Sequence, residues 1–196
     1  DLKKSGMESL DYVDFMKNKG EVVSDISLFL NNKEQMIAQW PNGRANFTTA
    51  GATYDKNGKF QSKDPETKRW GNVKESYLYG FFSQDYNFDK TKLGEIDPEN
   101  NTLTFAHPLG GGIIQDTATR RYQAFNLLEE LDVASEWYID RENLILYYFP
   151  PYELSQNDKI ELAVNKDPLI KFTTYNDVDK DNMHIIFKGI NFSKTV

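Results

Sequence analysis

The chain has 196 residues, of which 39% are hydrophobic and 27% charged, and this composition is typical of one well-buried soluble domain or one domain plus a fragment of another. The net charge of −7 argues against a nucleic-acid partner, and no apolar run is long enough to predict membrane insertion. The chain has no cysteine, which excludes disulfides, thiol nucleophiles and thiolate metal sites.

Short strands separated by turn residues dominate the first hundred positions. The alternating stretch SDISLFL ends at Asn31 and Asn32, and an apolar pattern resumes in MIAQW, which predicts two strands joined at this turn. Asn57-Gly58 is the strongest hairpin signal in the chain, and residues 97–101 predict the loop of another hairpin. The pattern predicts a mainly β fold, an antiparallel β-barrel or β-sandwich.

One segment interrupts the β pattern. Apolar residues recur at a spacing of three within DTATRRYQAFNLLEELD, and Thr117 or the residue before it could cap a helix there. These residues are Tyr122, Phe125, Leu128 and Leu131. The spacing predicts one short helix of about three turns within residues 117–131.

The stretch ASEWYIDRENLILYYFPP predicts a hairpin over residues 136–149. Large apolar side chains occupy both faces, so both faces are expected to be covered, one by the β core and one by the helix. The density of aromatic residues also fits a sugar-binding platform, but such platforms usually leave one face polar. Core packing is therefore the favoured interpretation, with Trp137 buried.

Few residues offer catalytic chemistry. His107 and His184 belong to no recognisable triad, and the acidic run at residues 177–182 lacks the glycine and the glutamate of a calcium loop. Five carboxylates could supply the pair that glycoside hydrolysis needs, although acidic residues are common at turns. They are Glu129, Glu130, Asp132, Glu136 and Asp140. We predict no catalytic residue, no metal site and no cofactor.

Three phrases together resemble a known family. LFLNNKEQMIAQWPN, RYQAFNLLEELDVASEWYIDRENLILYYFPP and HIIFKGINFSKT are similar to signatures of bacterial right-handed parallel β-helix proteins, in particular alpha-1,3-galactosidase-like glycoside hydrolases. The chain departs from the family pattern at Gln39, where the family usually has Arg, and at residues 133–135, which replace Pro-Gly. The resemblance implies a β-barrel inserted near the start of a β-helix.

The resemblance also implies a domain organisation. A β-barrel or β-sandwich domain is expected over residues 1–175, and residues 176–196 are expected to begin a truncated parallel β-helix. The chain starts DLKKSG without an initiator Met, which fits a piece of a longer polypeptide. Because the family's catalytic carboxylates lie on later coils, the parent is expected to be a glycoside hydrolase, whereas this fragment is not expected to be catalytic.

The function implied is that of a non-catalytic β domain of a secreted, bacterial carbohydrate-active protein, extracellular or on the cell surface, that scaffolds or lines a glycan cleft. The alternative is an independent carbohydrate-binding module, which needs exposed aromatic rings for stacking on sugars. Trp70, Tyr79 and Phe82 are the candidate carbohydrate-binding residues, with core or edge packing as their alternative role.

The final stretch predicts an unpaired edge. Residues 183–192 alternate as a β-helix strand should, and in the absence of a following coil one side of that strand is expected to remain open. Self-association of the fragment through this edge is therefore expected.

Overall fold

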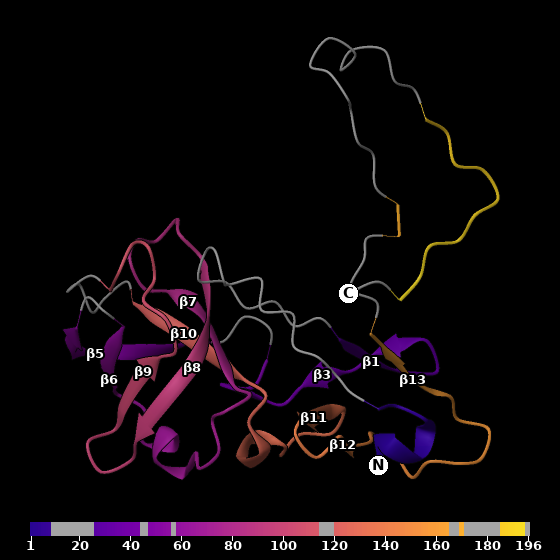
Figure 1. Cartoon of the computed structure of the whole chain (residues 1–196), viewed down its shortest axis with the longest axis horizontal. Coiled ribbons are helices and arrows are strands. Elements are labelled where there is room, and N and C mark those ends of the chain that lie inside the picture. The colour runs from indigo at the N-terminus through magenta and orange to yellow at the C-terminus, as the bar shows by residue number, and fades with distance from the viewer. Residues whose placement is uncertain are drawn as a thin grey trace.

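The computed structural model describes residues 1–8, 26–43, 47–55, 58–113, 120–164, 169–170 and 185–194 (Figure 1). The strands in these ranges are β1 (Ser27–Leu30), β2 (Lys33–Glu34), β3 (Met36–Ile37), β4 (Gln39–Trp40), β5 (Thr48–Asp55), β6 (Lys59–Ser62), β7 (Tyr77–Phe81), β8 (Asp89–Asp97), β9 (Thr102–Phe105), β10 (Arg121–Phe125), β11 (Glu136–Asp140), β12 (Ile145–Phe149) and β13 (Ile160–Ala163). Three short 3-10 helices accompany them: η1 (Leu2–Ser5), η3 (Pro65–Arg69) and η4 (Leu128–Glu130). The architecture is mainly β and sandwich-like, and no helix in the described ranges is long and apolar enough to cross a membrane.

A seven-stranded antiparallel sheet forms the larger body. Its order is β4-β10-β5-β6-β9-β8-β7, and β10 also pairs with β7 along its whole length. Its core is built from large side chains that are almost fully buried, among them Phe60, Trp70, Phe82, Leu103 and Tyr122. Strand β10 is therefore a central strand, with partners on both of its edges.

Two three-stranded sheets, β13-β1-β2 and β12-β11-β3, lie beside the larger sheet (Figure 1). All of their pairings are antiparallel except that of β3 with β11, which is parallel. A second core forms around Leu28, Trp137, Ile139 and Leu144. The chain passes between the bodies at Ala38, whose N–H donates to the carbonyl of Trp137 and whose carbonyl accepts from Asn126.

The predicted turns form as their residue types suggest. Asn31 and Asn32 both have positive φ, 50° and 66°, and they join β1 to β2 in register. Two positive φ values are what a tight hairpin turn requires, and asparagine tolerates them. The hairpins β5-β6 and β8-β9 also form, the second around the loop after Asp97, whose carboxylate accepts from the N–H of Asn100. Asn57 lies outside the described residues.

The predicted helix is wrong over its described part. Residues 121–125 form strand β10 and Leu128–Glu130 form the single 3-10 turn η4, while residues 114–119 lie outside the described ranges. The reason is that β10 is buried on both faces, so four consecutive residues from Tyr122 to Phe125 are inside. A strand that is buried on both faces loses the alternating pattern that identifies strands in a sequence.

The hairpin predicted over residues 136–149 forms as β11 and β12. Trp137 is only 2% exposed, which confirms that it belongs to the core. The expectation that both faces are covered holds for β11 but fails on β12, because Tyr147 and Phe149 remain exposed. The helix that was expected to cover one face is not formed over residues 120–131.

The final segment carries no strand in its described part. Residues 185–194 have neither strand nor helix, and residues 185–193 are exposed (Figure 1). The strand expected there is therefore not formed over these residues, and the sheet topology gives them no pairing. Residues 171–184, which include His184 and the acidic run at 177–182, lie outside the described ranges.

Candidate functional site

A groove opens where β3 and β4 pass the aromatic face of β7 and β10. Its volume is about 350 Å³. The lining residues are Glu34, Gln35, Met36, Ile37, Gln39, Phe47, Tyr79, Phe88, Gln123 and Phe125. Such a combination of aromatic and aliphatic walls with a few polar groups is typical of small-molecule sites.

The aromatic part of the groove is a continuous cluster of rings. The Tyr79 ring lies 4.6 Å from that of Phe125 and 5.8 Å from that of Phe88, measured between centroids. Tyr77 stacks on Phe125 at 5.3 Å and supports it from the side. Lys90 Nζ lies 4.4 Å from the Tyr79 centroid, so one side of this ring already meets a cation. Phe88 is 45% exposed and offers the most accessible ring in the groove.

The polar part of the groove consists mainly of three glutamine amides. Gln35 donates to the carbonyl of Lys33 at 2.8 Å and accepts from the Tyr148 hydroxyl at 2.6 Å. Gln123 donates to the carbonyl of Gly43 at 3.0 Å. These contacts hold the amides of Gln35 and Gln123 in fixed orientations.

Gln39 differs from the other two glutamines. Its side chain is 4% exposed, and its Nε2 is buried without a hydrogen-bond partner among the described residues. Alternation along β4 explains its position, since Gln39 faces the groove while the next residue, Trp40, points the other way and donates to Asp64 at 2.7 Å. A buried donor without a partner is unusual in folded proteins, and a bound water, ion or ligand is the usual kind of group that satisfies it.

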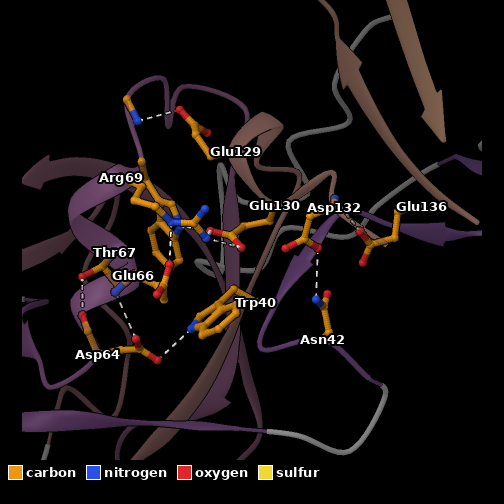
Figure 2. Close-up of polar contacts among 12 residues, drawn as sticks. Trp40, Asn42, Asp64, Glu66, Thr67, Arg69, Glu129, Glu130, Asp132 and Glu136 are labelled. Carbon is orange, nitrogen blue, oxygen red and sulfur yellow. Dashed lines mark hydrogen bonds and ion pairs between the residues drawn. The ribbon is translucent and has the colours of Figure 1, made fainter. Parts of the chain in front are cut away.

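The second polar cluster surrounds η4 (Figure 2). Glu130 is fully buried and accepts from Trp70 Nε1 at 2.6 Å and from Arg69 Nη2 at 3.0 and 3.1 Å. Glu129 accepts from the N–H of Gly71 at 2.8 Å. Both carboxylates therefore bind η4 to the last residue of η3 and to the two residues that follow it.

Glu136 and Asp132 hold the next part of the same loop. Glu136 Oε2 accepts from the N–H groups of Val133 and Asp132 at 3.1 and 3.3 Å, while its Oε1 is buried with no partner among the described residues. Burial raises the pKa of Glu136 to about 7, and the neighbouring Asp132 and Glu130 add to this effect. Asp132 accepts from Asn42 at 3.0 Å (Figure 2).

The carboxylates that could have formed a hydrolytic pair thus serve structural roles. Glu130 and Glu136 are both completely buried, which keeps a glycosidic bond away from them. Asp140 caps a turn by accepting from the N–H of Asn143 at 2.9 Å. No group of three or more acidic or histidine side chains in the described ranges could hold a metal ion.

The three candidate carbohydrate-binding residues differ in burial, because Trp70 and Phe82 lie in the core and Tyr79 lines the groove. Trp70 is 1% exposed and donates to Glu130, and Phe82 is 0% exposed within the larger core, so neither ring has a free face in this structure. Tyr79 lines the groove. Phe88 was not identified from the sequence, although its position in the polar loop SQDYNFD is a recognisable sign of exposure.

No family model and no curated protein sequence matches the chain. A solved structure described as "Glycoside hydrolase" matches it with a TM-score of 0.53 and 14% sequence identity. The match covers 68% of this chain and 26% of that chain, so this chain spans about a quarter of the length of the structure it resembles. At this identity the likeness shows a shared fold alone.

Proposed function

We propose that the chain is a non-catalytic β domain that binds a neutral glycan in the groove between β3-β4 and β7-β10. The observation that carries the proposal is the groove itself, in which exposed and half-buried aromatic rings face buried amide groups. Sugar rings present apolar C–H faces that pack on aromatic rings, and hydroxyl groups that bond to amides. Phe88 and Tyr79 supply the stacking surface in this proposal.

The charges around the groove favour a neutral ligand. Glu34 is the charged residue among those that line it, and the chain as a whole is acidic. An anionic sugar would meet a carboxylate of the same sign there. The carboxylate of Glu34 does not repel a neutral sugar.

The wider assignments belong to the same proposal. The domain would be part of an extracellular or cell-surface carbohydrate-active protein, with residues 1–175 as the β domain and residues 176–196 leading into a parallel β-helix. The motif resemblance supports this, and the fold shared with part of a glycoside hydrolase agrees with it. Hydrolysis would be carried out by the rest of such a protein.

An independent carbohydrate-binding module is the second candidate. It is favoured by the Phe88 ring, which is 45% exposed at the groove and offers a stacking surface within this chain. A scaffold domain would instead share its ligand with another part of the parent protein. Both candidates predict binding of a glycan by the 196-residue chain alone. A module should bind as tightly alone as within the parent protein, whereas a scaffold domain should bind more weakly alone.

The test is a titration of the chain by isothermal calorimetry with neutral oligosaccharides built from glucose, galactose, mannose, xylose or N-acetylglucosamine. We expect at least one to bind with a Kd of about 1 mM or tighter. Phe88→Ala should weaken that binding by about tenfold, because it removes the exposed ring while disturbing little of the core. Phe149→Ala is the matched control, since Phe149 is equally exposed, at 45%, on β12 and does not line the groove. Absence of binding to the whole panel, or equal loss in both variants, would contradict the proposal.

A further inference from the structure

Gln39 lines the groove, and its amide nitrogen makes no hydrogen bond within the described residues. Nε2 is buried and has no partner among the described residues, whereas the amides of Gln35 and Gln123 donate to backbone carbonyls. A buried N–H that makes no hydrogen bond keeps its desolvation penalty. A ligand that supplies an acceptor at this point removes the penalty.

The surroundings of Gln39 are apolar. It lies opposite Phe125 in the pairing of β4 with β10, and Met36 and Ile37 line the same cavity. The Phe125 ring in turn lies 4.6 Å from Tyr79, which connects Gln39 to the aromatic wall. These neighbours of the amide are apolar, while Glu34, Gln35 and Gln123 supply the other polar groups of the groove lining.

The chemistry of this corner distinguishes between sugar substituents. A hydroxyl could accept from Gln39, but its own O–H would then need a second acceptor, and Met36, Ile37 and Phe125 offer none. A carbonyl is an acceptor only, so it leaves no donor unsatisfied. A methyl group attached to that carbonyl would gain contact with Met36 and Ile37.

We infer that the groove selects sugars that carry an N-acetyl group, with Gln39 Nε2 donating to the acetamido carbonyl and the methyl packing on Met36 and Ile37. The inference rests on the proposed glycan binding and assigns a ligand class to it. A small rotation about the terminal torsion of Gln39, which is a soft degree of freedom, turns the N–H toward the ligand. Gln39 is thus a specificity-determining residue, and stacking on Phe88 and Tyr79 is common to all sugars.

Two trisaccharides that differ only in the substituent at C2 of each sugar test the inference. N-acetylchitotriose and cellotriose share the same β-1,4-linked backbone, and the first has an acetamido group where the second has a hydroxyl. We expect the wild-type chain to bind N-acetylchitotriose at least tenfold more tightly in calorimetric titrations, which corresponds to about 1.4 kcal/mol. In Gln39→Met, which keeps the length of the side chain but removes the donor, the two affinities should become equal to within about threefold.

Gln61→Met is the matched control, because Gln61 is an exposed glutamine on β6 outside the groove, and it should keep the wild-type preference. Equal binding of both trisaccharides by the wild-type chain, binding of cellotriose alone, or a preference that survives in Gln39→Met would overturn the inference while leaving glycan binding intact. Failure of the whole oligosaccharide panel would instead overturn the proposed function.

A measurement on the unmodified chain covers the case in which Gln39→Met does not fold. Saturation-transfer NMR with N-acetylchitotriose should show the acetyl methyl protons receiving the strongest saturation, because the methyl is the most deeply enclosed part of the ligand. Stronger saturation of the sugar-ring protons would place the acetamido group in solvent and would overturn the inference.

Discussion

Replacement of Glu130 tests what holds η4 against the larger core. In Glu130→Ala the indole N–H of Trp70, a residue that is 1% exposed, loses its acceptor at 2.6 Å. An unsatisfied buried donor costs about 1 to 3 kcal/mol, and the lost methylene adds about 0.8 kcal/mol. We therefore expect Glu130→Ala to lower the free energy of unfolding by about 2 to 4 kcal/mol.

The conservative variant separates the acceptor from the charge. Burial raises the pKa of Glu130, which means that the surroundings on balance disfavour its ionised form despite the nearby Arg69. In Glu130→Gln the amide oxygen can still accept from Trp70, and Arg69, about half exposed, remains hydrated and in contact with Glu66. We expect Glu130→Gln to cost less than about 1 kcal/mol.

The assay is urea unfolding at pH 7, followed by far-ultraviolet circular dichroism, for the wild type, the two Glu130 variants and Glu66→Ala. The last is the control for Arg69, because Glu66 pairs with the same guanidinium at 2.5 Å but is itself partly exposed, and its loss should cost less than about 1 kcal/mol. If Glu130→Gln costs as much as Glu130→Ala, the ion pair with Arg69 and not the indole bond stabilises this region. A cost below 1 kcal/mol for Glu130→Ala would show that water replaces the carboxylate.

Two further predictions concern stability. Gly80→Ala should lower the unfolding free energy by at least about 2 kcal/mol in the same assay, because the new Cβ would lie 2.5 Å from the carbonyl oxygen of Arg121 on the neighbouring strand. Gly110→Ala is the control and should have little effect, because nothing lies within 4 Å of the Cβ that it adds. Glu136 should make the protein less stable as pH rises. Its pKa is about 7 in the folded chain against an ordinary 4.5, so the folded state binds the proton more tightly than the unfolded state. The free energy of unfolding should therefore fall by up to about 3 kcal/mol between pH 4.5 and pH 8. In urea unfolding, the stability of Glu136→Gln relative to the wild type should rise by about 2.5 kcal/mol from pH 5 to pH 8. An unchanged difference at the two pH values would refute the assignment.

The hairpins were predictable because their turns are local. Asn31-Asn32 and residues 97–101 need only a few residues to define a turn, and the strands on either side pair in register without help from distant segments. The aromatic stretch over residues 136–149 was predictable for the same reason. The exposure of Tyr147 and Phe149 on this hairpin was not predictable, because it depends on which element covers the sheet.

The groove could not be predicted, because it depends on pairings between distant segments. Met36 pairs in parallel with Glu136, which lies a hundred residues later in the sequence. No local sequence pattern predicts a strand of two residues that joins such a distant segment. The burial of Trp70 and Phe82, both predicted as sugar-binding residues, was unpredictable for a related reason. Aromatic residues near turn signals look exposed in a sequence, but here the turns fold back on the core.

The position of the groove follows from the change of sheet at Ala38. Residues before it pair with β11 in the smaller body and residues after it pair with β10 in the larger one, so each sheet covers only one half of this short stretch. The side chains of Met36, Ile37 and Gln39 therefore face a gap that neither sheet fills with its own residues. A gap between two packed bodies is where ligands often bind, because its walls are rigid on both sides and its floor is already desolvated. The same geometry explains why an unpaired amide N–H is found at Gln39. This strand of two residues pairs its backbone with β10, but Nε2 of Gln39 has no hydrogen-bond partner among the described residues.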